Sequence, residues 1–168
     1  AHGFDNLAEV NSLSPLLMDR YADAATTLGA AWAKAVLARE TEPPADAAAA
    51  RSLAEAAVMP LLDRAYRRPA SPDERQNVMV LFDRLTAAGF DRGEAVGAVA
   101  ARILAAPAFL YRIERDGPIG QDRRVDGHEL ATRLSYFLWS TMPDDELMAT
   151  AARDGLATDD AIRSQVRR

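Results

Sequence analysis

The amino-acid sequence predicts an all-α fold of about seven helices behind an irregular N-terminal lead-in. Two patterns carry this prediction. First, side chains that cap helix N-termini recur along the chain, often with Pro at the next position or Glu three positions later. Second, the apolar residues that follow these signals are three or four positions apart, which places them on one face of a helix. No segment shows the alternating apolar and polar pattern of a convincing strand.

Seven helices are expected from these signals. Their approximate ranges are 15–39, 46–67, 72–88, 92–113, 127–140, 143–155 and 158–168. The sharpest start is the capping box Ser71–Glu74, which has Pro72 at the first helical position. Gly89 is expected to cap the third helix. Pro60 is expected to kink or split the second helix, and Pro107 to bend the fourth helix or separate a short last turn.

Two of the predicted helices have apolar faces that the spacing of their residues predicts to be buried. In helix 15–39 one face is predicted to be buried, and it consists of Leu17, Tyr21, Ala24, Ala25, Leu28, Ala31 and Trp32. In helix 127–140 the predicted core stripe consists of Leu130, Leu134, Phe137 and Leu138. Tyr136 and Trp139 are three positions apart and are predicted to face a second, partly exposed side. Such a side normally docks against another domain, and it can also bind a ligand.

The composition excludes several classes of protein. The chain has 168 residues, a formal net charge of -5 and a pI of about 5.1, which argues against nucleic acid as the main partner. No apolar run approaches the roughly 20 residues that span a bilayer. There is no Cys, which excludes disulfides and a thioether-attached haem within these residues. The chain starts without Met or a signal peptide and ends inside a predicted helix, so processed or cut ends are expected.

Four motifs occur in order along the chain and resemble those of a known family. They are Gly3-Phe4-Asp5-Asn6 with Leu13-Ser14-Pro15, Arg64-Ala65-Tyr66-Arg67-Arg68-Pro69 with Ser71-Pro72-Asp73-Glu74, Ala105-Ala106-Pro107-Ala108-Phe109-Leu110-Tyr111-Arg112, and Glu129-Leu130-Ala131-Thr132-Arg133-Leu134-Ser135-Tyr136-Phe137-Leu138-Trp139 with Met142-Pro143-Asp144-Asp145. The pattern is similar to large exported proteins of planctomycetes and myxobacteria. These carry a planctomycete-type cytochrome c domain followed by a string of domains of unknown function.

The resemblance implies an organisation and a location. Residues 1–40 would be the end of a first family domain, residues 41–116 a central helical domain, and residues 117–168 the truncated start of a third. It also implies a periplasmic or cell-envelope protein with a c-type haem in another domain of many full-length members. The sequence departs from the family in one respect that matters. It has no Cys-x-x-Cys-His, so no cofactor is expected in this chain itself.

The basic cluster Arg64, Arg67 and Arg68 is the first candidate contact site. Arg64 and Arg68 are four positions apart on one helix face, close to a helix C-terminus whose dipole they complement. The favoured interpretation is an interhelix or interdomain salt bridge, for example to Glu114 or Asp116. The alternative is a site for an anionic ligand, because guanidinium groups bind carboxylates and phosphates bidentately.

The second candidate site lies on helix 127–140. Glu129 and Arg133 have the i,i+4 spacing and orientation of a favourable ion pair, and they lie beside the aromatic residues Tyr136 and Trp139. No metal site is expected, because His2 and His128 are far apart and His128 is interpreted as a surface residue. A haem contact from His128 to a neighbouring domain is the minor alternative.

Three functions remain open from the sequence. The first is a non-catalytic structural or interaction module, which contacts other domains of the same polypeptide or a redox partner. The second is part of a periplasmic oxidoreductase pocket, and the third is a carbohydrate-binding module that uses Tyr136 and Trp139 for stacking. No catalytic residue is assigned, and the oligomeric state is left open.

Overall fold

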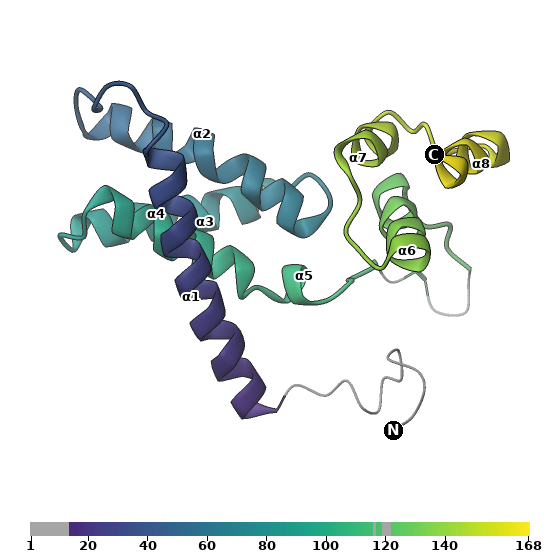
Figure 1. Ribbon diagram of the computed structural model, residues 1–168, viewed down its shortest axis with the longest axis horizontal. Coiled ribbons are helices and arrows are strands. Elements are labelled where there is room, and N and C mark those ends of the chain that lie inside the picture. The colour runs from purple at the N-terminus through teal and green to yellow at the C-terminus, as the bar shows by residue number, and fades with distance from the viewer. Residues whose placement is uncertain (1–13, 116, 119–121) are drawn as a thin grey trace. The chain divides into compact units, whose positions relative to one another are not determined.

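A computed structural model describes residues 14–115, 117–118 and 122–168, and within them it confirms the all-α class. The described residues form eight helices and no strand (Figure 1). The helices are α1 (Pro15–Leu37), α2 (Ala47–Tyr66), α3 (Pro72–Ala87), α4 (Arg92–Leu104), α5 (Pro107–Leu110), α6 (Gly127–Trp139), α7 (Asp145–Ala152) and α8 (Asp159–Arg167). The predicted lead-in lies outside the described residues. No helix in the described part is long and apolar enough to cross a membrane.

The predicted N-caps are formed by side-chain hydrogen bonds. Ser71 and Glu74 form the reciprocal capping box at α3, with Glu74 N donating to Ser71 Oγ at 3.2 Å and Ser71 N donating to a Glu74 carboxylate oxygen at 2.7 Å. Asp91 caps α4 and Asp126 caps α6 in the same way. At the end of α3, Gly89 has a φ of 92°, and Phe90 N donates to Leu85 O at 3.1 Å. This arrangement is a Schellman cap, as Gly89 predicts.

The two internal prolines have different effects. Of the two outcomes predicted for Pro60, a kink or a split of the second helix, the split is wrong, because α2 continues through Pro60 to Tyr66. Ala56, whose carbonyl loses its helical donor at Pro60, and Pro60 itself are both exposed, so water can satisfy that carbonyl. Pro107 does separate a short turn, because α4 ends at Leu104 and Pro107 begins α5.

The chain forms two compact units. The first consists of residues 1–55 and 78–105, so its described part holds α1, α4 and one portion each of α2 and α3. The second consists of residues 56–77 and 106–168 and holds the other portions of α2 and α3 together with α5–α8. The first unit buries Phe82 of α3 and the α4 residues Val96, Val99 and Ile103.

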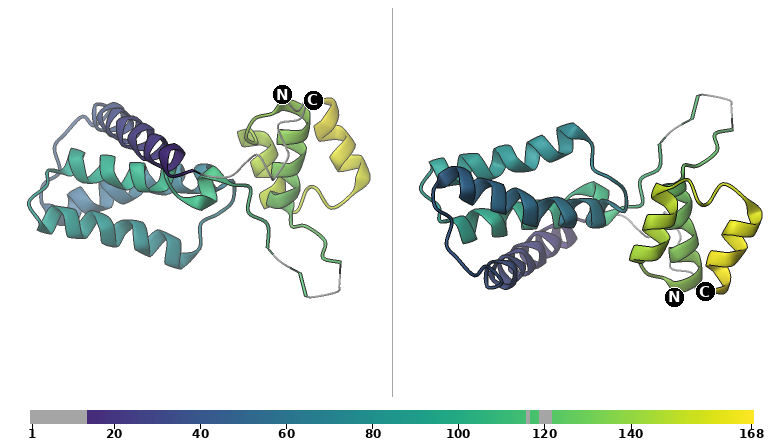
Figure 2. Two further views of the ribbon diagram at one scale, coloured as in Figure 1. Left: turned by 90° about the horizontal axis from the view of Figure 1, so that it is seen from below. Right: turned by 90° about the horizontal axis from the view of Figure 1, so that it is seen from above.

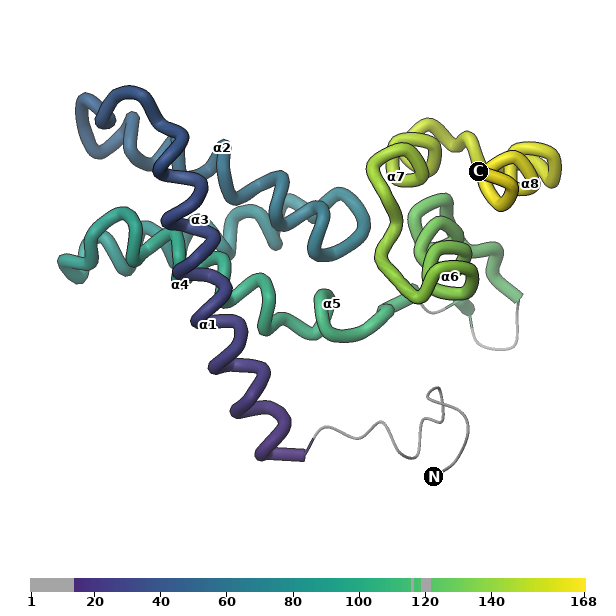
Figure 3. Tube along the Cα trace, in the orientation of Figure 1, coloured from purple at the N-terminus to yellow at the C-terminus, as the bar shows by residue number. Residues whose placement is uncertain are grey.

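In the first unit, α1 packs on α4 through small residues (Figures 1 and 3). The buried residues of α1 are Ala25, Gly29 and Ala33. A Cβ atom on Gly29 would lie 2.5 Å from the carbonyl oxygen of Gly97 and 2.8 Å from the backbone nitrogen of Ala101. The two helix backbones are therefore in direct contact, which only small side chains permit.

This crossing overturns the predicted buried face of helix 15–39. Of the seven residues on that face, only Ala25 is buried. Leu17, Tyr21 and Leu28 are exposed to 36%, 39% and 58%. The helical spacing of apolar residues in the sequence selects the most apolar face of a helix. In contrast, α1 buries the face with the smallest side chains, because these allow the closest approach to α4.

In the second unit, α6 and α7 lie side by side (Figure 2). Their contact also depends on a glycine, since a Cβ atom on Gly127 would lie 2.8 Å from the carbonyl oxygen of Ala151. The core of this contact consists of Ala131, Leu147, Ala151 and Leu156, with Leu130 packed against it. Ser135 is fully buried and donates to the carbonyl of Thr141 at 2.7 Å.

The contact between α1 and α4 predicts a specific sensitivity of the first unit. We expect Gly29→Ala to lower the free energy of unfolding by about 1–3 kcal/mol, because a buried methyl group forces apart two packed backbones. Gly93→Ala is the matched control, since its Cβ would meet only side-chain atoms, the nearest at 3.2 Å. Urea unfolding followed by circular dichroism measures both variants. Equal stability of the two would show that the helix crossing is looser than described.

Candidate interaction surface

Arg67 holds the end of α2 to α5 and to the segment that follows it. Its φ of 56° lies in the left-handed region, at the helix-ending position that usually belongs to Gly. Its side chain is only 5% exposed, and it donates hydrogen bonds to the carbonyls of Ala108 (2.6 Å), Phe109 (3.2 Å) and Tyr111 (2.7 Å). The guanidinium thus satisfies carbonyls at the end of α5 that have no helical donor.

The prediction of a carboxylate partner is wrong for Arg67, which binds carbonyl oxygens instead. Its neighbours Arg64 and Arg68 each do pair with a carboxylate. Arg68 binds Glu74 with two hydrogen bonds of 2.8 Å, and its guanidinium carbon lies 5.7 Å from the centre of the Tyr66 ring. The hydrogen bonds from Arg68 lower the pKa of Glu74 to about 2, aided by the backbone N–H of Ser71. Arg64 pairs with Asp145 at 2.6 Å on an exposed surface, where such a pair adds little stability.

The other partners suggested for this basic cluster are engaged elsewhere or undescribed. Glu114 pairs with Arg133, and Asp116 lies outside the described residues. All three arginines of the cluster therefore have protein partners, which leaves the anionic-ligand interpretation without an unpaired guanidinium.

Glu129 does not form the predicted pair with Arg133. It lies at the third position of α6, where its carboxylate turns back to the helix start and accepts from Asp126 N at 2.8 Å. The same carboxylate accepts two hydrogen bonds from Arg123, at 2.8 and 2.9 Å, and one from the backbone N–H of Arg115 at 2.9 Å. These bonds, that of Arg123 first, lower the pKa of Glu129 to about 2. The capping role draws Glu129 away from Arg133, which lies one turn in the opposite direction.

Arg133 and Tyr136 instead bind the segment that follows α5. Arg133 Nε donates to a Glu114 carboxylate oxygen at 2.6 Å, and this hydrogen bond lowers the pKa of Glu114. The Arg112 guanidinium lies over the Tyr136 ring, with its carbon 5.0 Å from the ring centre. With the bond between Glu129 and Arg115, these contacts fix residues 112–115 along α6.

Large apolar side chains are exposed on this segment and in the last turn of α6, and we refer to this set as the aromatic platform. It consists of Tyr111 (43% exposed), Ile113 (63%), Phe137 (86%), Leu138 (38%) and Trp139 (43%). Its three α6 members are consecutive residues and therefore point to different sides of the helix. Trp139 is partly exposed, as its position predicts. The core position predicted for Phe137 is wrong, because α6 buries Ala131 and Ser135 and Phe137 lies on the far side of the helix. Leu138 lies on the same face as Ala131 and Ser135, but it is 38% exposed in the last turn of α6.

His128 is half-buried rather than a fully exposed surface residue. Burial lowers its pKa, the charge of Asp126 opposes that shift, and the charge of Arg68 adds to it. Within the described ranges, no group of three or more His, Asp or Glu side chains is arranged to hold a metal ion. The other histidine, His2, lies outside these ranges.

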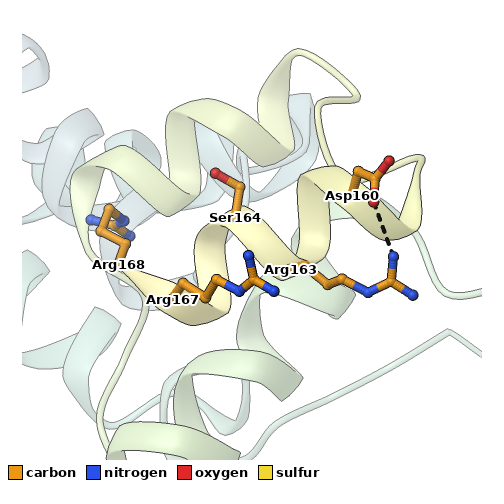
Figure 4. A pocket seen from close by; sticks show the side chains of 5 residues that line it. All are labelled: Asp160, Arg163, Ser164, Arg167 and Arg168. Atoms are coloured by element: carbon orange, nitrogen blue, oxygen red, sulfur yellow. Dashed lines mark hydrogen bonds and ion pairs between the residues drawn. The ribbon is translucent and has the colours of Figure 1, made fainter.

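A polar hollow of about 740 Å³ lies on α8 (Figure 4). Its lining consists of Asp160, Arg163, Ser164, Arg167 and Arg168. Arg163 pairs with Asp160 at 2.9 Å, and Arg168 pairs with Asp144 at 2.7 Å and Glu146 at 3.1 Å. The carboxylates beside the hollow balance its guanidinium charges. The hollow is therefore neither an apolar cleft nor a concentrated anion site.

Three family models match the chain, in order. Residues 1–34 match PSD3, a protein of unknown function (DUF1587), and residues 53–114 match PSD5, a protein of unknown function (DUF1595). Residues 125–168 match PSD4, a protein of unknown function (DUF1592). No curated protein and no solved structure matches the chain. The chain is thus similar to a series of domains of unknown function, and the aromatic platform draws its residues from the second and third matched stretches.

The contacts of Arg67 predict that it stabilises the second unit strongly. We expect Arg67→Ala to lower the free energy of unfolding by about 2–4 kcal/mol, because it leaves three carbonyls without a donor. Arg64→Ala removes an exposed arginine three positions earlier, in the last turn of α2, and is expected to cost less than about 1 kcal/mol. Thermal or urea unfolding of both variants measures the difference. A similar small loss for both would contradict the anchoring role of Arg67.

The lowered pKa of Glu129 predicts a dependence of stability on pH. A carboxyl with a lowered folded-state pKa contributes stability that is fully present above its ordinary pKa of 4.5 and is lost as the pH falls toward about 2. We therefore expect Glu129→Gln to flatten the loss of stability over this range of pH. Glu55→Gln, which removes one charge from an exposed ion pair on α2, is the control. An unchanged acid profile in Glu129→Gln would show that its carboxylate is not held as described.

Proposed function

We propose that this chain is a non-catalytic interaction module of a larger exported protein. The aromatic platform is the surface that docks, and the occupant is another domain of the same polypeptide or its redox partner. The observation that carries the proposal is the exposure of Phe137 to 86% in the last turn of α6. Large aromatic residues of this kind are enriched at the centres of protein interfaces.

The way the platform is held also supports docking. Arg67, Arg112 and Arg133 fix residues 108–115 to their neighbours, so the platform residues stand on an ordered backbone. A surface fixed before binding loses less conformational entropy when a partner arrives. The platform combines rigid support with exposed apolar side chains, which suits a permanent contact between domains better than a flexible recognition loop.

The location and the redox setting belong to the same proposal and rest on the family resemblance. We place the full-length protein in the periplasm or cell envelope, with a c-type haem in another domain. This chain would then position the haem domain or a substrate-binding domain. Its own residues include no Cys to attach such a haem.

Exposed aromatic side chains also favour the carbohydrate-binding alternative. Trp139 and Phe137 have free surface for stacking on a sugar ring. Tyr136 is less suited to this role than the sequence predicts, because Arg112 already lies over its ring. The oxidoreductase-pocket alternative needs polar groups that converge in an apolar cleft, and the hollow on α8 has no such lining.

Hydrogen exchange tests the docking function. In the full-length protein, backbone amides of residues 109–115 and 134–141 are expected to exchange more slowly than in the isolated 168-residue chain. The variant Phe137→Asp should remove this extra protection without unfolding the chain, because the side chain it replaces is exposed.

Val166→Asp is the matched control, since Val166 is 42% exposed on α8 and lies outside the platform. Equal exchange of the platform amides in the full-length protein and the isolated chain would rule out docking there. Binding of the isolated chain to a polysaccharide such as cellulose or chitin, lost in Trp139→Ala, would support the carbohydrate alternative.

A further inference from the structure

A second exposed apolar surface lies on α1, in the first unit. Leu17, Tyr21, Ala24, Leu28 and Ala31 follow one another at spacings of four, three, four and three residues, and all five are exposed. We call this row the α1 seam. The contact of α1 with α4 uses a different row, Ala25, Gly29 and Ala33, so that contact leaves the seam uncovered.

The spacing of the seam points to a helix as its occupant. Apolar residues that alternate between steps of four and three repeat on average every 3.5 residues, which is the period of helices that pair in coiled coils. Leu16 and Met18, exposed to 65% and 43%, widen the apolar surface at the N-terminal end of the seam. The row is long enough for two full heptads, so a partner helix can contact it at several successive layers.

One edge of the seam carries two cations, with Asp23 one turn away from the first of them. Arg20, Thr27 and Lys34 are spaced seven residues apart along this edge. Arg20 and Lys34 form no ion pair with any residue that the structure describes. The opposite edge carries no charge: Met18 and Trp32 lie on it, and Ala25 between them is buried. In paired helices, the edge residues select the partner by charge.

A second copy of this chain would not supply a carboxylate partner for Arg20 or Lys34. In an antiparallel pair of α1 helices, like edges meet, so Arg20 of one copy would approach Lys34 of the other. In a parallel pair, the charged edge would face the uncharged edge. Neither arrangement gives Arg20 or Lys34 a carboxylate partner.

We propose that the α1 seam binds an amphipathic helix of a different domain or protein. The apolar residues of this helix alternate between spacings of four and three, and acidic residues lie along one edge of them. These apolar residues pack against Leu17, Tyr21 and Leu28, and the acidic edge pairs with Arg20 and Lys34. This site is independent of the aromatic platform, because it lies on another helix in the other compact unit.

Two synthetic helical peptides test the proposal. Each has about three heptads with Leu at the four-three positions. One carries Glu and the other carries Lys at the edge positions, and the remaining positions are the same in both. Fluorescence anisotropy of labelled peptide, titrated with the 168-residue chain, measures binding. We expect the Glu peptide to bind about fivefold to tenfold more tightly than the Lys peptide, through two exposed ion pairs.

Variants of the chain sharpen the test. Arg20→Glu combined with Lys34→Glu should reverse the preference, so that the Lys peptide binds more tightly. Leu28→Glu should abolish binding of both peptides without unfolding the chain, since Leu28 is 58% exposed. Leu53→Glu is the matched control, because Leu53 is 39% exposed on α2 in the same unit and lies outside the seam. Circular dichroism checks that each variant stays folded.

Four results would overturn the proposal. The first is that neither peptide binds, and the second is equal binding of the two peptides. The third is sedimentation of the unmodified chain as a dimer that Leu28→Glu converts to a monomer, which would assign the seam to a second copy. The fourth is binding to phosphatidylglycerol vesicles that Leu28→Glu abolishes, in the absence of peptide binding, which would assign the seam to a lipid surface.

Discussion

The three hydrogen bonds of the Arg67 guanidinium are the interaction on which the second unit most depends. Arg67 adopts the left-handed conformation where α2 ends, and from this turn its side chain reaches the carbonyls at the end of α5. Gly would adopt the turn with less strain but has no guanidinium. Once residues 108–111 are fixed, the next residues along the chain can reach α6, where Arg112 covers Tyr136 and Glu114 pairs with Arg133. The position of the aromatic platform follows from this sequence of contacts.

Close contacts of small residues explain why so much apolar surface is left exposed. Gly29 of α1 against α4, and Gly127 of α6 against α7, leave no space for a methyl group. In both α1 and α6 the buried row is therefore the one with the smallest side chains. Several large apolar residues of these helices, among them Leu28 of α1 and Phe137 of α6, are then exposed, whereas Leu130 of α6 packs against the core. These exposed residues belong to the two candidate interaction surfaces. An exposed row of large apolar residues beside a tightly packed small-residue row is a feature that a partner can cover.

The sequence predicts the helices well and their buried faces poorly, for a physical reason. A capping box such as Ser71 with Glu74, or a left-handed stop at Gly89, depends on residues within a few positions of each other. The face that a helix buries depends on what approaches it, and the sequence of α1 alone does not show that Gly97 lies against Gly29. The sequence predicts ion-pair partners poorly for the same reason. Glu129 is four positions from Arg133, yet its capping role and Arg123 determine where its carboxylate lies.

The charges around the two surfaces select among partners more sharply than their apolar residues do. The chain carries a net charge of -5, so two copies repel each other at distances within the Debye length, roughly 10 Å at moderate ionic strength. One edge of the α1 seam nevertheless carries the cations Arg20 and Lys34, whereas beside the aromatic platform Arg133 is paired with Glu114. A partner with acidic residues at the rim of an apolar patch would therefore meet local attraction at the α1 seam. A second copy of this chain would present the same basic edge. This pattern favours contacts between unlike domains, as expected of a module that joins different parts of a larger protein.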